Sequence, residues 1–248
     1  MLALTKGRYR VRTAVTDSDL GAAQRLRQLA FHPDDAAAGH SPDSDPFDAL
    51  CTHVLVTDIN SGQLVCCFRI LELPDGAQIE RSYSAQFYEL SPLKQFPGRM
   101  IEIGRFCIHP HYPDPDILRL AWAALTRHVD AQGVEMLFGC SSFKGTDRNP
   151  YLDTFAMLKD SHLAPAQWRP MVKAQQVFRF AARLRRRPDR RKALQAMPPL
   201  LRTYLMMGGW VSDHAVIDKQ MDTLHVFTGL EISAIPDARK KLLRAVSA

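Results

Sequence analysis

Residues 100–140 constrain the fold more than any other stretch, because they predict a strand, a helix and a second strand in succession. The apolar run MIEIGRFCIHP, from Met100 to Pro110, begins as a buried strand and leads into a proline-broken loop. A helix from Ile117 to Gln132 has one apolar face and stops at Gly133, and Val134 to Cys140 is another buried strand. A strand–helix–strand unit of this kind is typical of an α/β protein.

The first of these strands carries two charged side chains, Glu102 and Arg105, in an otherwise apolar run. Side chains alternate between the two faces of a strand, so positions 102 and 105 point to opposite sides unless the strand is bulged. A carboxylate and a guanidinium are costly to bury unless each is paired. One interpretation is a structural ion pair within a sheet. The other is a general base, Glu102, with Arg105 as the residue that orients it.

Composition sets the class of protein. A chain of 248 residues with 46% hydrophobic and 23% charged residues can bury a sizeable core. No run approaches the roughly 18 apolar residues of a membrane span, and MLALTKGRYRVRTA at the start lacks the apolar stretch of a signal peptide, so we expect a cytoplasmic protein.

The five cysteines have no CxxC spacing, so we expect them to be reduced and mostly buried. His109 and His111 have no further ligand pair at metal spacing, so no metal site is predicted.

Hydrophobic periodicity and turn residues predict the remaining elements. These are a strand from Tyr9 to Val15, a helix capped by Asp17 or Ser18 that runs to Phe31, a hairpin of residues 53–59 and 63–71 around Asn60-Ser61-Gly62, a short helix or irregular connection from Glu80 to Leu93, and a late strand from Leu224 to Leu230. Residues 32–46 are rich in Asp, Pro, Ser, Ala and Gly and predict a surface loop, either a lid beside a site or a solvated loop.

Residues 171–205 differ from the preceding pattern, since they are mainly helical with breaks at Pro188 and at Pro198-Pro199. The chain contains neither an internal repeat nor a low-complexity linker. We therefore predict one domain, residues 1–248, in which residues 171–205 form a basic helical insertion.

Further charged residues lie at the ends of the predicted core elements, where a cleft would form. The first helix ends with Arg27-x-x-x-Phe31, which places both side chains on one helical face. Asp45 and Asp48 precede the first hairpin strand, and Arg69 is near the end of the second. Taken singly, each charge is better interpreted as a solvated or paired surface residue.

In this order, R-x-x-x-F, D-x-x-D, R and E-x-x-R are similar to the signature of acyl-homoserine-lactone synthases. The rest of the chain more closely resembles a sister family, the bacterial ornithine N-acyltransferases that begin ornithine-lipid synthesis. The matching segments are FDALCTHVLV, EIGRFCIHPHY, LFGCSSFKGTD and PPLLRTYLMMGGWVSDHAVIDKQMDTLHVF. Both families have the fold of the GCN5-related N-acyltransferases, so the resemblance implies an α/β (α+β) protein with a mixed central sheet flanked by helices.

The resemblance implies an N-acyltransferase that moves a (3-hydroxy)acyl chain from acyl carrier protein to the α-amino group of L-ornithine and forms lyso-ornithine lipid. It implies no cofactor of the enzyme's own, because the acyl donor is a 4'-phosphopantetheine thioester on the carrier protein. Two alternatives stay open. One is an acyl-homoserine-lactone synthase that acylates S-adenosylmethionine, and the other is a non-catalytic, membrane-binding protein of the same fold.

Within the resemblance, Glu102 accepts the amine proton directly or through a water, and Arg105 orients it. Backbone amides near Phe106, Cys107 and Ile108 hold the thioester carbonyl and its oxyanion. Asp45 and Asp48 are candidates for the distal ammonium of ornithine, and Arg69 or Arg27 for its carboxylate. The complete set of substrate-binding candidates is Arg27, Phe31, Asp45, Asp48, Arg69, Phe106, Cys107, Ile108, Ser141 and Ser142. Cys107 and Cys140 are better interpreted as buried thiols than as acyl-carrying nucleophiles.

The loop after the charged strand bears on the acyl donor. Coenzyme-A-dependent relatives carry Q/R-x-x-G-x-G/A there, and its backbone amides hold pyrophosphate at a helix start. This chain has HPHYPDPD instead, and the carboxylates of Asp114 and Asp116 would repel a pyrophosphate. The sequence therefore favours a carrier-protein thioester over coenzyme A.

The net charge of +6 comes from one segment. Its basic residues, opposed only by Asp189, are Arg179, Arg183, Arg185, Arg186, Arg187, Arg190, Arg191 and Lys192. This segment could dock acyl carrier protein or an anionic membrane surface, and the apolar stripe of Val177, Phe180, Ala181 and Leu184 fits a membrane-surface helix. No nucleic-acid motif accompanies it, so nucleic acid ranks last among its partners. A peripheral position at the inner membrane face is compatible with a cytoplasmic enzyme.

Overall fold

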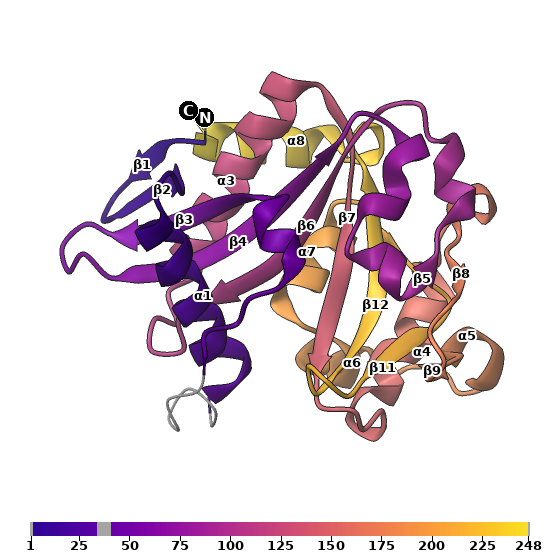
Figure 1. The fold of residues 1–248 in the computed structure, drawn as a ribbon. Helices are drawn as coiled ribbons and strands as arrows, with labels where there is room; N and C mark the ends of the chain where they lie inside the picture. The colour runs from indigo at the N-terminus through magenta and orange to yellow at the C-terminus, as the bar shows by residue number, and fades with distance from the viewer. Residues whose placement is uncertain (1, 34–40, 248) are drawn as a thin grey trace. The chain divides into compact units, whose positions relative to one another are not determined.

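The computed structural model describes residues 2–33 and 41–247 (Figure 1). The chain divides into two compact units: the first consists of Met1–Glu72, Ile103–Val134 and Asp237–Ala248, and the second of Leu73–Glu102 and Glu135–Pro236. Strand β6 (Arg99–Ile108) therefore contributes its beginning to the second unit and its end to the first.

The first unit is built on antiparallel strands in the order β1 (Leu4–Lys6), β2 (Tyr9–Thr13), β3 (Thr52–Asp58) and β4 (Leu64–Leu73), with β6 next in the sheet. The hairpin predicted around Asn60-Ser61-Gly62 is confirmed, and Gly62 adopts the left-handed conformation (φ 71°) that the tight turn needs. Strand β1 was not predicted, because its three residues are mostly exposed and carry no apolar alternation.

Among the described residues, this unit contains the helices α1 (Asp17–Phe31), α3 (Pro115–Gln132) and α8 (Asp237–Ser247). Thr16 caps α1, where Asp17 or Ser18 was expected, because its hydroxyl and the Asp19 carboxylate form a reciprocal capping box. Helix α3 confirms the prediction: Asp114 caps it and Gly133 ends it with φ 62°. Part of the predicted loop at 32–46, residues 34–40, lies outside the described residues. The rest leads into the 3-10 helix η1 (Pro46–Ala49).

The second unit is built on β7 (Val134–Lys144), β12 (Thr223–Glu231), β11 (Ala215–Asp218) and β9 (Val177–Phe178), in that order. A short strand, β10 (Trp210–Val211), also pairs with β12, and β5 (Tyr88–Glu89) pairs with β8 (Met171–Val172). Strand β7 runs past the predicted end at Cys140, because its antiparallel partner β12 continues the ladder to Lys144. The predicted late strand at 224–230 is confirmed as β12.

Between Gly76 and Gln95 the second unit contains three 3-10 helices, η2 (Gly76–Arg81), η3 (Ser84–Gln86) and η4 (Ser91–Gln95), as the irregular pattern there predicts. Helix α4 (Leu152–Ser161) follows β7, between the short helices η5 (Asn149–Tyr151) and η6 (Ala166–Trp168). A last one, η7 (Ile232–Ala234), follows β12.

Residues 171–205 lie wholly within the second unit and are only partly helical. Helices α5 (Phe180–Arg183), α6 (Arg190–Ala196) and α7 (Pro199–Met206) are separated at the prolines, as predicted. The beginning of the segment was wrongly predicted as helix: residues 171–172 and 177–178 are strands, since β5 and β11 offer them ladder partners that periodicity alone does not reveal.

Candidate active site

Glu102 lies in β6 as a buried carboxylate, 4% exposed, that accepts hydrogen bonds from the beginning of η3. The backbone N–H of Tyr83 donates to Oε2 at 2.8 Å, and the N–H and hydroxyl of Ser84 donate to Oε1 at 2.7 and 2.6 Å. The first N–H groups of a helix have no partner inside it, so Glu102 takes the place of a capping side chain. Hydrogen bonds of this kind favour the ionised carboxylate.

Arg105 has an unusual backbone for a strand residue. Its φ is 51°, a left-handed conformation that few non-glycine residues adopt. Strand alternation places positions 102 and 105 on opposite faces unless the strand is bulged, and the left-handed backbone at Arg105 interrupts the regular strand geometry at this point. The ion-pair partners of the Arg105 guanidinium are Asp43, with 3.3 Å between Nε and Oδ2, and Asp45, with 3.0 Å between Nη2 and Oδ2.

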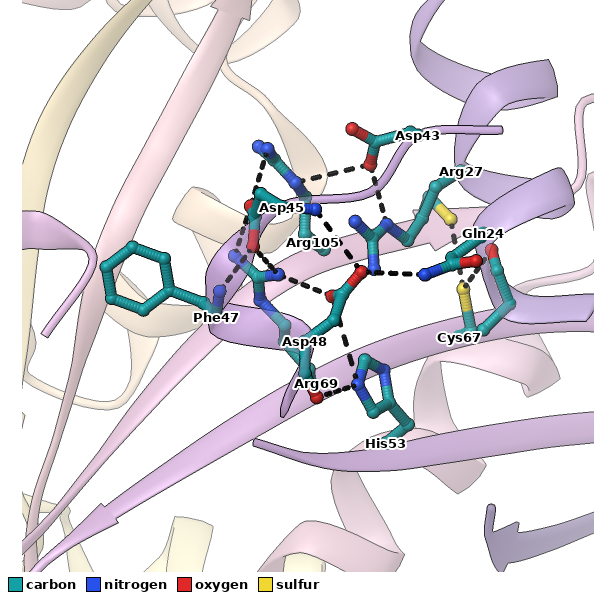
Figure 2. A network of polar contacts seen from close by, with 12 residues as sticks. Gln24, Arg27, Asp43, Asp45, Phe47, Asp48, His53, Cys67, Arg69 and Arg105 are labelled. Atoms are coloured by element: carbon teal, nitrogen blue, oxygen red, sulfur yellow. Dashed lines mark hydrogen bonds and ion pairs between the residues drawn. The ribbon is translucent and has the colours of Figure 1, made fainter. Parts of the chain in front are cut away.

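Arg27 and Asp48 form the buried centre of a larger network in the first unit (Figure 2). Nη1 of Arg27 donates to Oδ1 of Asp48 at 2.6 Å, and Nε donates to Oδ2 of Asp43 at 2.6 Å. Gln24, one turn before Arg27 on α1, donates to Oδ2 of Asp48 at 3.0 Å. Nη2 of Arg27 is buried and has no hydrogen-bond partner within the described part of the chain.

Arg69, near the end of β4, connects Asp45, which caps η1, with Asp48, which lies within η1. Its Nη1 donates to both Asp45 and Asp48 at 2.6 Å, and its Nη2 donates to Asp45 at 2.8 Å. Beside them, Nε2 of His53 lies 3.0 Å from the backbone oxygen of Asp48. The guanidinium groups of Arg27, Arg69 and Arg105 thus face three carboxylates, which gives a network with no net formal charge.

Electrostatics in this network follows from burial and pairing. Burial alone raises the pKa of Asp48, but hydrogen bonds from Arg27 and Gln24 outweigh it and hold that pKa well below its ordinary value. The pKa of Asp45 is also lowered, because the Arg69 guanidinium overcomes the effect of burial. Burial lowers the pKa of His53, which favours the neutral imidazole.

The sequence placed Arg27, Asp45, Asp48, Arg69 and Arg105 at one site, and the structure brings all five together. Their contacts are with one another, so the interpretation of each as a paired charge also holds.

The other predicted residues of the first unit are mainly apolar neighbours of this network. Phe31 packs against a core cluster that includes Cys107. Phe106 stacks on Phe68 with 5.2 Å between ring centroids, and Ile108 is half-buried at the end of β6. The Cys107 thiol is 5% exposed and lies 3.5 Å from the Cys67 sulfur, as expected for a buried structural cysteine.

In the second unit, Ser141 and Ser142 lie on β7 with opposite exposure. Ser141 is buried and accepts a hydrogen bond from the Thr228 hydroxyl at 2.9 Å, whereas Ser142 is exposed. All five cysteines are free; Cys66 is buried, and Cys51 and Cys140 are partly exposed.

The contributors that were missed in the sequence are Gln24, Asp43, His53, Tyr83 and Ser84. Asp43 had a visible signal, since it stands two residues before Asp45 in DSDPFD. Tyr83 and Ser84 had none, because the N–H groups of an irregular connection carry no residue-type signature.

The basic segment keeps its eight cationic side chains exposed. Its predicted apolar stripe is directed inward: Phe180 is fully buried in an aromatic core with Phe143, Phe155 and Phe178, and Leu184 packs against the same core. The stripe is therefore part of the protein interior. The exposed face of the segment is cationic, and Arg186 forms an ion pair with Asp153 at 2.7 Å.

Residues 2–33 and 41–247 lack two other features. No helix there combines the length and the apolar character that crossing a bilayer requires. No cluster of three or more histidine, cysteine or acidic side chains there is arranged to bind a metal ion.

The mixed sheet and its flanking helices form a GNAT-like α/β fold, and the chain is an acyltransferase. Residues 26–123 match the family model described as an acetyltransferase (GNAT) domain. Over 244 residues the chain is 33% identical to the L-ornithine N(alpha)-acyltransferase of Rhodobacter capsulatus, which covers 94% of this chain and 93% of the relative. The chain belongs to this family of acyltransferases.

The chain is also similar to other proteins. The L-ornithine N(alpha)-acyltransferase of Brucella abortus is 28% identical over 242 residues, which are 92% of this chain and 86% of that protein. Among solved structures, the acyl-homoserine-lactone synthase LasI is 17% identical with a TM-score of 0.46, and the match covers 90% of each chain. The N-acyl amino acid synthase FeeM from uncultured soil microbes is 12% identical with a TM-score of 0.48, over 91% of this chain and 92% of FeeM.

Proposed function

We propose that this acyltransferase moves a 3-hydroxyacyl chain from acyl carrier protein to the α-amino group of L-ornithine and releases lyso-ornithine lipid. The names of its relatives support the acceptor. The observation that carries the chemistry is the buried carboxylate of Glu102, held by three hydrogen bonds on the strand that also bears Arg105. A fixed, ionised carboxylate is what the deprotonation of an ammonium requires.

The α-ammonium of ornithine loses a proton to Glu102, directly or through one water. The amine nitrogen then forms a bond with the thioester carbonyl carbon. As the carbon–sulfur bond breaks, the nitrogen loses a second proton and the phosphopantetheine sulfur leaves with a proton as a thiol, so the products are an amide and a thiol. The left-handed backbone at Arg105 turns the peptide groups that follow it out of the regular strand pattern. We assign the oxyanion to amides among Phe106, Cys107 and Ile108 on that ground.

The arginine–aspartate network supports a role in acceptor binding. Most of its hydrogen-bonding capacity is used internally, but the buried Nη2 of Arg27 is a donor without a partner among the described residues. We assign the ornithine carboxylate to this donor, because guanidinium groups suit carboxylates. Asp45 is the most exposed of the three aspartates, with 16% of its side chain accessible, and is the candidate for the distal ammonium.

The beginning of α3 supports a carrier-protein donor. The Asp114 carboxylate accepts the N–H of Asp116 at 2.9 Å and the hydroxyl of Tyr9 at 2.7 Å. A carboxylate already occupies the position at which a helix start would otherwise bind pyrophosphate. The exposed cations of residues 179–192 offer a surface for the acidic carrier protein or for anionic lipid, consistent with an enzyme at the cytoplasmic face of the membrane.

The test is the mass of the product formed from 3-hydroxyacyl-carrier protein with L-ornithine or with S-adenosylmethionine. We expect an acyl-ornithine and no product from S-adenosylmethionine. Acylation of S-adenosylmethionine alone would instead assign the chain to homoserine-lactone synthesis, and the absence of any product would favour a non-catalytic role. Acyl-coenzyme A in place of the carrier thioester should be a poor donor.

The same assay with Glu102→Gln tests the base. The amide retains the shape of the side chain but cannot take up a proton, so we expect kcat to fall by about 10²–10⁴-fold. Glu135→Gln, an exposed glutamate of the same unit, serves as the matched control. Wild-type turnover in Glu102→Gln would remove this residue from the mechanism.

A further inference from the structure

Ser84 makes two of the hydrogen bonds that hold Glu102. Both reach the same oxygen, Oε1, at 2.7 Å from the backbone N–H and 2.6 Å from the hydroxyl. Ser84 is fully buried and Glu102 is 4% exposed, so bulk water does not compete for these contacts. A short hydrogen bond from a neutral hydroxyl to a buried carboxylate is among the strong ones that proteins make.

The direction of the hydroxyl hydrogen follows from the partners. An ionised carboxylate only accepts, so the single hydroxyl hydrogen of Ser84 points to Glu102. The sulfur of Cys140, on β7, lies 3.5 Å from the same hydroxyl oxygen. With the hydroxyl hydrogen engaged, the thiol is the donor of this contact, which gives the order Cys140 to Ser84 to Glu102.

We propose that Ser84 is the positioning residue of the base Glu102 and that the Cys140 thiol orients the Ser84 hydroxyl. This inference rests on the function proposed above, because it matters for turnover only if Glu102 takes up a proton. The hydroxyl has two effects: it fixes the orientation of the carboxylate, and it favours the ionised form, which must be present before the amine can be deprotonated.

Other titratable groups near Glu102 within the second unit are Tyr204 on α7 and, through Ser84, Cys140, whereas Tyr83 contacts the carboxylate through its backbone N–H. Burial raises the pKa of Tyr204, and the negative charge of Glu102 raises it further, so this phenol stays neutral across the acidic range. A change in the titration of Glu102 at acidic pH therefore does not come from ionisation of Tyr204.

The test is a titration of the Glu102 carboxyl by ¹³C NMR in protein labelled at glutamate carboxyls, with Glu102→Gln identifying the signal. Ser84→Ala removes the hydroxyl and keeps both backbone donors. We expect its titration midpoint to lie about one pH unit above the wild-type value, a roughly tenfold higher proton affinity. Ser84→Thr restores the hydroxyl and should return to the wild-type midpoint, and Ser84→Cys, with its weaker donor, should fall between. Equal midpoints in wild type and Ser84→Ala overturn the proposal.

Cys140 has its own pair of variants. Cys140→Ala frees the Ser84 hydroxyl to rotate, so we expect a smaller shift in the same direction, whereas Cys140→Ser keeps a donor and should match the wild type. An unchanged midpoint in Cys140→Ala would remove the thiol from the proposal.

Turnover separates this inference from the proposed function. In the acyl-ornithine assay, the acidic limb of the pH profile of kcat/KM should move to higher pH in Ser84→Ala, by the same amount as the titration midpoint of Glu102. Protonation of the ornithine amine is the same in all variants and does not contribute to this shift. A shifted carboxyl titration in a protein that acylates no ornithine would refute the function and leave the hydrogen bond in place. An active wild type with no difference between variants would refute the role of Ser84 alone.

Discussion

Asp48 receives hydrogen bonds from two guanidinium groups and an amide while only 8% of the residue is exposed. A charge at such a depth is tolerated because each partner compensates for lost water. The same arrangement makes the stability of the protein sensitive to substitution of Asp48, since removing the carboxylate leaves Arg27 and Arg69 buried with unbalanced charge.

We therefore expect Asp48→Asn to lower the free energy of unfolding by about 3–5 kcal/mol at neutral pH. The folded-state pKa of Asp48 is depressed, so its stabilisation is complete above the unfolded-state pKa of about 4 and is lost as the pH falls below it. Denaturant unfolding of both proteins should show a difference that shrinks in acid.

Asp116→Asn is the control for Asp48→Asn, because its carboxylate pairs with Arg119 on the surface and its side chain is 64% exposed. An exposed pair contributes at most about 1 kcal/mol. Equal effects of the two substitutions would contradict the structural role of the network.

At the scale of elements, the sequence predicted best where a local signal and the tertiary environment agree. Helix α3 has an apolar face, an acidic cap and Gly133, and the hairpin has Gly62 at its turn. The prediction of helix was wrong at residues 171–178, since the strands there pair with partners that are distant in the chain. The charged residues of the site were predictable because their order in the chain is similar to a known signature. The contact between Ser84 and Glu102 has no such signature and was not predictable.

The basic segment is the element whose partner is most open to experiment. Phe180 is buried and Ala181 and Leu184 pack against the same core, so the exposed cations are the groups that would attract a carrier protein or lipid. Reversal of Arg185, Arg187 and Arg190 to glutamate spares Arg186, which is paired with Asp153. We expect the KM for acyl carrier protein to rise severalfold, or binding to anionic vesicles to weaken, with a difference that fades at high salt.

Reversal of Arg10, Arg99 and Lys219 changes the net charge equally at exposed positions outside residues 171–205. This control should leave the KM for acyl carrier protein and the binding to anionic vesicles near the wild-type values. If neither partner responds to the first set of reversals, the segment is not a docking surface for either.

At the scale of the whole molecule, the pH dependence of stability should carry the signature of His225. This residue of β12 is 2% exposed and lies against the rings of Phe87 and Tyr88. Burial lowers the pKa of His225 to about 4, so the folded protein holds the neutral ring where the unfolded chain, with a histidine pKa of about 6.5, binds a proton.

The unfolded state therefore gains protons first as the pH falls. The stabilisation is complete above about pH 6.5 and decreases toward pH 4, by up to about 3 kcal/mol. His225→Asn, which retains a hydrogen-bonding group near the Tyr88 hydroxyl, should flatten this part of the curve in denaturant unfolding. His111→Asn on the surface should not change it. A wild-type slope in His225→Asn would show that other groups produce the pH dependence.

The arginine–aspartate network also has a consequence for the order of folding. The contacts of Arg27 with Asp43 and Asp48 span 16 and 21 residues, and those of Arg69 span 21 and 24, whereas the contact between Arg105 and Asp45 spans 60. Longer loops close later, because more chain entropy must be lost before the contact forms. During synthesis, Arg27 and Arg69 can therefore pair early with the aspartates around Asp45. The charges of the network balance only after Arg105, near the end of β6, has left the ribosome.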